Sequence, residues 1–137
     1  MIVYQENLDN INPQMLNNFF QGWISFPSQE KHFELLQKSS YKIIAVDREK
    51  NIVAGFITAI SDGVLSAYIP FLEVIPDYKN HGIGSELVTR MFEKLKDCYM
   101  IDILCDEDVQ GFYEKLGMKK STGMIKRNYQ NQDGTGK

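Results

Sequence analysis

The sequence is poor in the residues that build disulfide and metal sites. Its 137 residues include two cysteines and two histidines. Cys98 and Cys105 have no histidine nearby at ligand spacing, so we expect two reduced thiols at the ends of a strand rather than a disulfide or a metal site. No apolar run approaches the roughly 20 residues of a membrane-spanning helix, and the N-terminus lacks a basic region followed by an apolar block. These absences favour a cytoplasmic protein without a metal and without a membrane partner.

The charge distribution argues against nucleic acid as a partner. The net charge is −3, and lysine and arginine form no stripe along the sequence. A chain of this length makes one domain, and a hydrophobic fraction of 43% supplies an ordinary core. We expect residues 1–129 to form that domain and the polar residues 130–137 to be a flexible tail.

Turn signals and hydrophobic periodicity predict an α/β (α+β) domain. Three strand patterns joined by tight turns form an antiparallel meander. A helix and an apolar strand follow, and a helical connection makes that strand a parallel neighbour. We therefore expect a mixed, mostly antiparallel sheet of about six or seven strands with about four helices. The predicted strands are 2–4, 41–46, 52–60, 64–75, a buried strand 100–105 and one or two in 119–129; the predicted helices begin after Pro13 and Ser28 and cover 82–96 and 108–116.

A glycine-bearing loop stands between the longest predicted strand and the next helix. It reads Lys79-Asn80-His81-Gly82-Ile83-Gly84. A loop that opens a helix presents unpaired N–H groups at the positive end of the helix dipole and can bind phosphate. A dinucleotide fingerprint would need glycine where Leu87 stands, and a P-loop would need Gly-Lys-Ser/Thr where Gly84-Ser85-Glu86 stands. The loop therefore indicates either a phosphorylated ligand of another kind or an ordinary chain reversal.

Pro70 lies inside the longest predicted strand. Proline cannot donate to a strand ladder and is confined to edges, strand starts and bulges. A bulge at Pro70 would bend this strand away from its parallel neighbour and splay the two central strands. The backbone groups of residues 71–74 would then need partners. An extended ligand that contains amides would supply them, and so would water in a crevice.

Two motifs, taken in order, resemble the GNAT N-acetyltransferase superfamily. In that family a bulged strand leads into [Arg or Gln]-x-x-Gly-x-[Gly or Ala] and a helix, as residues 72–85 do here. The later run Gly111-Phe112-Tyr113-Glu114-Lys115-Leu116-Gly117-Met118 is similar to the family's Phe-Tyr-Glu-Lys-Leu-Gly-Phe segment. The element order matches over residues 1–129, and the specific motifs lie within 64–118. The resemblance implies the acyl-CoA N-acyltransferase fold, with acetyl-CoA or a related acyl-CoA as donor.

The resemblance also implies how the donor is held. The pyrophosphate would lie on the backbone amides of the glycine loop, and the pantetheine arm would pair with the neighbouring strand. Lys79 stands where Arg or Gln is usual and is a point charge without the bidentate fork of arginine, so the amides would carry most of the binding. Asp106 stands where relatives have Asn, and would cap the last helix and touch pantetheine. The implied set is Leu72, Val74, Lys79, Asn80, His81, Gly82, Ile83, Gly84, Ser85 and Asp106.

Acetyl transfer to an amine requires a base, a donor for the oxyanion and a donor for the leaving thiolate. The resemblance assigns the last role to Tyr113; the alternative is that Tyr113 is an ordinary core tyrosine. Glu73 is the leading candidate for the base, acting directly or through a water; the alternative is that it is a solvated or salt-bridged carboxylate. Asp102 is a rival, because a carboxylate within an apolar strand needs a partner or a role.

We expect aromatic and acidic side chains to form the acceptor site. The loop from Trp23 to Phe26, Tyr68 and the loop near residues 122–124 would line it, and these aromatics with the carboxylates of Glu73 and Asp102 would favour a small cationic amine. The same aromatics are equally suited to a core. We expect His32 to be a solvated helix residue. The leading function is direct attack of a primary amine on acetyl-CoA in a ternary complex. The alternatives are a protein or peptide N-acetyltransferase and a non-catalytic acyl-CoA-binding module, and a homodimer is compatible with either.

Overall fold

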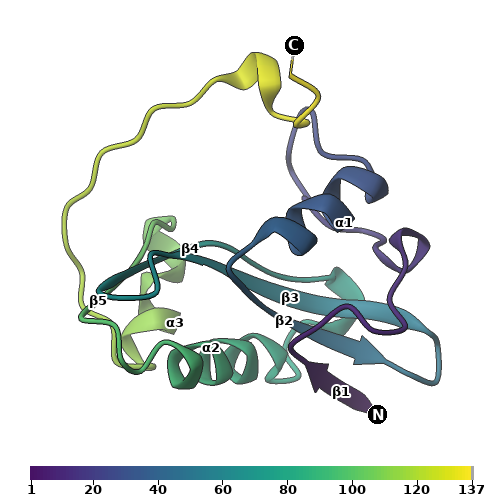
Figure 1. Ribbon diagram of the computed structural model, residues 1–137, viewed down its shortest axis with the longest axis horizontal. Coiled ribbons are helices and arrows are strands. Elements are labelled where there is room, and N and C mark those ends of the chain that lie inside the picture. Colours follow the sequence, from purple (N-terminus) through teal and green to yellow (C-terminus); the bar gives the residue numbers. More distant parts are fainter. Residues whose placement is uncertain (137) are drawn as a thin grey trace.

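A five-stranded sheet in the order β1-β2-β3-β4-β5 organises the chain (Figure 1). The computed structural model describes residues 1–136. The first three strand pairs are antiparallel and the last, β4 with β5, is parallel. The predicted meander and its parallel neighbour are therefore confirmed, but the described chain has fewer strands than the expected six or seven. The strands are β1 Ile2–Gln5, β2 Tyr41–Asp47, β3 Ile52–Ser61, β4 Ser66–Val74 and β5 Met100–Ile103.

Three α-helices accompany the sheet, where about four were expected. Helix α1 lies on one face of the sheet and α2 on the other (Figure 1). The hydroxyl of Ser28 accepts a hydrogen bond from the Lys31 N–H at 3.1 Å, which caps α1 as predicted. The helices are α1 Gln29–Lys38, α2 Ile83–Lys94 and α3 Gln110–Glu114, with single 3-10 turns η1 Pro13–Met15, η2 Pro76–Tyr78, η3 Glu107–Val109 and η4 Tyr129–Asn131.

The helix predicted after Pro13 is wrong, because the segment ends after one 3-10 turn. Asn18 and Phe20 have φ angles of 67° and 61°, which a right-handed helix does not contain. Phe19 and Phe20 are nevertheless buried. Their spacing therefore predicted correctly that both side chains are buried, but it predicted a helix that does not form.

The final strands predicted in 119–129 are also wrong. This segment is extended but pairs with no strand of the described chain. Gly117 has a φ of 99° and ends the helical region as predicted. Beyond η4, the Gln132 Oε1 accepts a hydrogen bond from the Ser25 N–H at 3.3 Å. The division into a domain of 1–129 and a flexible tail of 130–137 stays a prediction, and Lys137 lies outside the described residues.

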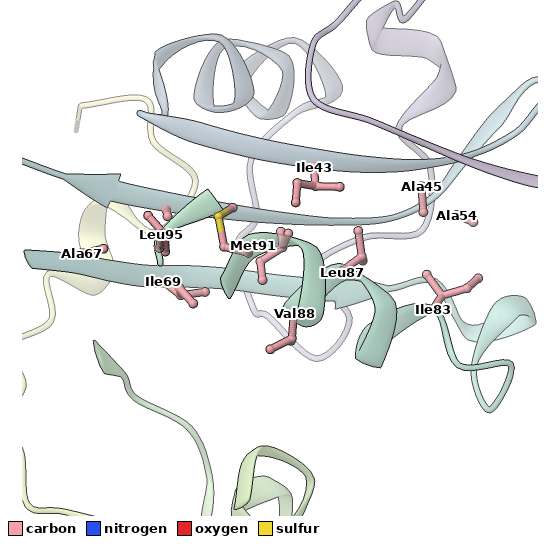
Figure 2. Packing of buried hydrophobic residues seen from close by; sticks show 12 residues of the cluster. Ile43, Ala45, Ala54, Ala67, Ile69, Ile83, Leu87, Val88, Met91 and Leu95 are labelled. Atoms are coloured by element: carbon pink, nitrogen blue, oxygen red, sulfur yellow. The ribbon is translucent and has the colours of Figure 1, made fainter. Parts of the chain in front are cut away.

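The two faces of the sheet bury two different clusters. The aliphatic cluster lies between the sheet and α2 (Figure 2). It contains Ile43, Ala45, Ala54, Ile57, Ala59, Ala67, Ile69, Ile83, Leu87, Val88, Met91 and Leu95. The aromatic cluster lies on the α1 face and contains Ile11, Met15, Leu16, Phe19, Phe20, Leu36, Ile44, Val46, Val53, Phe56 and Ile75. The helix-spaced residues of α2 face the sheet as their periodicity predicts.

Pro70 marks a bulge in β4. Tyr68 pairs with Ile60 and Phe71 with Thr58, so two residues of β4 stand opposite Ala59 alone. The extra residue reverses the side-chain alternation. Ala67 and Ile69 face the aliphatic cluster before the bulge, and Leu72 and Val74 contact it after the bulge. The bulge predicted from the proline is confirmed.

Candidate functional site

The central strands separate directly after the bulge. The β4–β5 pairing runs from Ser66 with Met100 to Ile69 with Ile103 and then stops. Residues 71–74 remain paired with β3 on one side only. Their other edge has no strand partner in the described chain. A backbone edge of this kind binds an extended ligand that carries its own amide groups.

The glycine loop lies next to this edge, at the start of α2. Asn80 and Gly82 have φ angles of 67° and 80°, and Gly82 is the N-cap of the helix. The first helical hydrogen bond runs from the Glu86 N–H to the Gly82 carbonyl at 3.1 Å. The N–H groups of residues 80–85 donate to no acceptor within the described chain. A row of free amides at the positive end of a helix is an anion-binding site.

The two sequence motifs meet at this loop. A Cβ placed on Gly84 would lie 3.5 Å from the Phe112 Cζ, so the second motif packs against the first turn of α2. The contact distance is an ordinary one and would accept alanine. Of the predicted loop residues, His81 places its Nδ1 3.1 Å from the Tyr78 carbonyl, to which it can only donate. Lys79 is exposed beside the loop.

Tyr113 lies on α3 and lines the groove beside β5. Burial raises the pKa of Tyr113 to about 12, and the charge on Cys105 would add to the shift. The hydroxyl therefore keeps its proton at neutral pH. No residue of the described chain accepts or donates a hydrogen bond at this hydroxyl, which leaves it available to a ligand as a donor.

Glu73 points to the opposite face of the sheet from its neighbours Leu72 and Val74. Its Oε1 accepts a hydrogen bond from the Phe20 N–H at 2.7 Å. Burial raises the pKa of Glu73, while that N–H and the charge of Lys79 oppose the shift. Phe20 is the bulky residue with a φ of 61°, so the carboxylate holds a strained backbone position. No pattern in the sequence indicates this contact between residues that are far apart in the chain.

The predicted acceptor residues fall into two groups. Trp23 packs on Phe20 and Phe71, with ring centroids 4.9 and 6.3 Å apart, close to Glu73. Tyr68 of β4 and Asp102 of β5 are paired in register, where these two strands still run side by side. Phe26 is 57% exposed and has no ring contact with a described residue.

Two details of β5 and its continuation correct the expectations. The strand 100–105 was expected to be buried, but β5 is the sheet edge and alternates exposed with partly buried residues. Asp102 is one of the exposed residues, so its charge is solvated and needs no buried partner. Asp106 precedes η3, and its side chain makes no capping hydrogen bond. The capping prediction is wrong because this helix opens as a 3-10 turn, in which the Asp106 carbonyl accepts from Val109.

His32 corrects another expectation, because it is buried rather than solvated. It is 2% exposed and lies between the rings of Phe19, Phe20 and Phe56 at 5.1, 4.9 and 4.5 Å. Burial lowers its pKa to about 4. The spacing from His32 to Leu36, four residues along a helix, is the signal that would have indicated the buried face.

Comparison with known proteins decides the family. A model of the acetyltransferase (GNAT) family matches residues 11–118. The chain belongs to the GNAT acetyltransferase family. The crystal structure of a putative acetyltransferase from Deinococcus radiodurans R1 is 40% identical, with a TM-score of 0.93 over 96% of this chain and 92% of that one.

Other GNAT proteins agree with this assignment. A GNAT family acetyltransferase from Streptococcus pneumoniae TIGR4 is 25% identical with a TM-score of 0.75, over 93% of this chain and 98% of that one. An uncharacterized N-acetyltransferase from Pyropia yezoensis is 28% identical over 90% of this chain and 74% of its own length. The resemblance read from the two motifs is thus confirmed, and the GNAT family makes this chain an acyltransferase.

Two kinds of feature are absent from residues 1–136. No helix in that range has the length and apolarity needed to cross a bilayer. No three His, Cys, Asp or Glu side chains in the same range are grouped to hold a metal ion. The GNAT family uses acetyl-CoA in general, and the parts described above are the ones available to hold it.

Proposed function

We propose that this GNAT protein transfers an acetyl group from acetyl-CoA to the primary amine of a small molecule, by direct attack in a ternary complex. One juxtaposition carries the proposal. The free amides of residues 80–85 follow directly after the unpaired edge of β4, and α3, which carries the unpartnered Tyr113 hydroxyl, approaches the first turn of α2 at Gly84 and Phe112. Acetyl-CoA carries a diphosphate, an amide-bearing chain and a sulfur atom, one group for each of these three parts.

The chain's own groups would hold the donor in three places. The amides of residues 80–85 would accept the pyrophosphate charge at the helix N-terminus. The exposed ammonium of Lys79 would add a point charge. The backbone of Leu72 and Val74 would pair with the pantetheine amides, which replaces the missing contact with β5.

Glu73 and Tyr113 would handle the protons. As the amine nitrogen bonds to the carbonyl carbon, Glu73 would take the amine proton directly or through a water. Its raised pKa makes it a stronger base than an exposed carboxylate. The Leu72 N–H would stabilise the oxyanion. As the carbon–sulfur bond breaks, the Tyr113 hydroxyl would donate to the departing sulfur.

Cys105 supports direct attack rather than transfer through the enzyme. Its thiol lies on the same groove as Tyr113. Burial raises the pKa of Cys105, and the charges of Asp106 and Asp108 raise it further. A thiol that stays protonated is a poor nucleophile, so an acyl-cysteine route is disfavoured.

Aromatic and acidic groups favour a cationic amine as acceptor. Trp23 lies beside Phe20, whose N–H donates to Glu73. Tyr68 and Asp102 contribute a second ring and a second carboxylate. Phe26, exposed on the Trp23 loop, would close the pocket. Rings and carboxylates together stabilise an ammonium ion before it loses its proton.

Thermal unfolding with ligands tests the donor. Acetyl-CoA at about 100 times its Kd should stabilise the protein by roughly 2.7 kcal/mol, which raises the midpoint by several degrees. ATP and NAD serve as controls. A shift with acetyl-CoA alone supports the proposal, and no shift with acetyl-CoA contradicts it.

Turnover tests the transfer itself. Release of free CoA thiol is measured with a panel of small amines and with peptides of free N-terminus. Small amines should be the better substrates. Tyr113→Phe should lower turnover on the order of a hundredfold while the acetyl-CoA thermal shift is kept. Tyr41→Phe, which removes a hydroxyl on β2 outside the groove that Tyr113 lines, is the control. Thermal shift without any turnover would favour a non-catalytic binding module.

We also propose a cytoplasmic location, on the strength of two free thiols. Cys98 and Cys105 are unpaired, one before and one after β5. Oxidising compartments tend to pair such cysteines. Thiol titration of protein purified under alkylating conditions should find both reduced.

A further inference from the structure

Phe20 has a backbone conformation that its surroundings must hold. Its φ is 61°, and a bulky residue keeps such an angle only where the neighbouring structure fixes it. The Phe20 N–H is also the hydrogen-bond donor to the Glu73 Oε1, at 2.7 Å. The orientation of this carboxylate therefore depends on what holds the Phe20 loop, defined as residues 18–22, against the sheet.

Within residues 1–136, three rings lie against the ring of Phe20. Trp23 comes just after the loop, with centroids 4.9 Å apart, and Phe71 lies on the same strand as Glu73, at 6.1 Å. His32 is the third, at 4.9 Å and with 61° between the ring planes. His32 belongs to α1, so it is the contact that joins the loop to an element outside both the loop and β4.

His32 also packs on the strand neighbour of Glu73. Its ring centroid is 4.5 Å from that of Phe56, and Phe56 on β3 is the residue paired with Glu73 across the sheet. One side chain thus contacts both neighbours of the carboxylate, namely Phe20, which donates to it, and Phe56, which lies beside it in the sheet.

The His32 ring acts here through its packing and not through proton transfer. It is 2% exposed, and its Nε2 has no hydrogen-bond partner within the described chain. Burial lowers the pKa of His32 to about 4, so the ring is neutral at pH 7. A neutral ring without that hydrogen bond contributes its shape, which fills the space between the loop and the sheet.

We infer that His32 is a positioning residue for the base, because it holds Phe20 against the sheet and Phe20 in turn orients Glu73. The inference rests on the proposed function, in which Glu73 takes the amine proton. Helix α1 also holds the chain just before the loop, since the Gln29 Nε2 donates to the Leu16 carbonyl at 3.1 Å.

The pKa of Glu73, followed by carbon-13 NMR of its side-chain carboxyl, tests the positioning. Burial raises this pKa, while the Phe20 N–H and the charge of Lys79 lower it. His32→Ala should release the loop, remove that N–H from the carboxylate and raise the pKa of Glu73 further. Because the pKa of His32 is about 4, its removal takes away no charge at the higher pH where Glu73 titrates. Glu73→Gln identifies the signal.

Two further variants separate positioning from stability. His32→Phe keeps a ring and removes the unpartnered nitrogen, so it should keep the wild-type pKa of Glu73. Val46→Ala truncates another fully buried side chain of the same cluster, on β2, and should destabilise the protein without moving that pKa. Urea denaturation measures the stability of each variant. If His32→Ala does not fold, His32→Leu, which keeps the volume without a ring, takes its place.

Turnover shows whether the positioning acts on the reaction. His32→Ala should lower kcat between about tenfold and a hundredfold. It should leave the KM for acetyl-CoA unchanged, because the amides of residues 80–85 and the free edge of β4 are not altered. His32→Phe should recover kcat.

Three outcomes overturn the inference. They are an unchanged pKa of Glu73 in His32→Ala, a shift of equal size in Val46→Ala, and a shifted pKa with wild-type kcat. A wild type that transfers no acetyl group would contradict the proposed function instead. The NMR titration needs no turnover, so it would still decide whether His32 orients Glu73.

Discussion

The two faces of the sheet are built from different side chains. Under α2 the buried cluster is aliphatic, and no titratable side chain lies among its buried members (Figure 2). On the α1 face the buried cluster adds three phenylalanines to its aliphatic members, and these rings surround His32 and adjoin Glu73. The His32 Nε2 and the Thr58 Oγ1 are both buried without a hydrogen-bond partner in the described chain.

This difference separates a face that supports the glycine loop from a face that contains backbone strain and buried ionisable groups. A regular helix on an aliphatic layer fixes the position of the glycine loop, because close-packed cores resist displacement. The α1 face contains a strained Phe20 and two ionisable groups with pKa values moved by burial, whereas on the α2 face Tyr113, whose pKa burial also raises, packs only at the rim of the cluster. Strain and shifted pKa values concentrate at functional sites. The four predictions below test this contrast.

The largest effect on stability is expected from truncating a buried side chain in either cluster. Leu87→Ala under α2 and Leu36→Ala under α1 both truncate a side chain that is 0% exposed. Each should lower the free energy of unfolding by about 3 kcal/mol, as measured by urea denaturation. Thr89→Ala, on the exposed side of α2, should change it by less than about 0.5 kcal/mol. A much smaller cost at Leu36 would mean that the aromatic face is loosely packed.

The pH dependence of stability should differ when His32 is replaced. Its pKa falls from 6.5 to about 4 on folding, so the folded state favours the neutral ring. The stability that results is complete above pH 6.5 and is lost as the pH falls towards 4, by up to about 3 kcal/mol. In His32→Leu this loss should be absent.

Urea denaturation of both proteins at several pH values between 7 and 4 measures the difference. His81→Leu is the matched control, because His81 is exposed. Parallel curves for wild type and His32→Leu would show that the buried ring does not drive acid sensitivity.

Alanine substitutions at the two glycines of the loop should have opposite effects on stability. Gly82 has a φ of 80°, so Gly82→Ala should cost about 1–2 kcal/mol through backbone strain alone. Gly84 lies inside α2 without a positive φ, and its added Cβ would meet Phe112 at an ordinary 3.5 Å. Gly84→Ala should therefore raise stability, by up to about 1 kcal/mol. Thermal and urea unfolding compare the pair, and equal effects at both positions would contradict the backbone assignment.

The smallest effect on stability is expected from Glu73→Gln. Its pKa is raised by burial, so its charged form is disfavoured and stability is lost as the pH rises through that pKa. Glu73→Gln removes the charge and keeps an acceptor for the Phe20 N–H. At pH 7 it should raise stability by less than about 1 kcal/mol, while turnover falls.

Glu73→Ala separates the two roles of this residue. It leaves the Phe20 N–H without its acceptor and should cost about 1–3 kcal/mol. If Glu73→Gln turns over amines as fast as the wild type, Glu73 positions the Phe20 loop and is not the base.

Prediction from sequence succeeded where one local rule decided the outcome. Leu87 and Met91 share a helix face by spacing alone, which predicted α2 correctly. Pro70 cannot donate within a ladder, which predicted the bulge correctly. It failed after Pro13, where the apolar spacing of Phe19 and Phe20 imitated a helix. They are buried from a loop that packs in the cluster on the α1 face, and no local pattern distinguishes such a loop from a helix.

The sequence by itself determined the glycine loop before a helix, the bulged strand and the tyrosine-bearing second motif, because each depends on the geometry of a few consecutive residues. Only the tertiary structure decided that the Phe20 N–H meets Glu73, that His32 is buried between three rings, and that residues 119–128 leave the sheet. These features join residues far apart in the chain, and the free energy that selects them comes from packing and burial, which act only once the sheet exists.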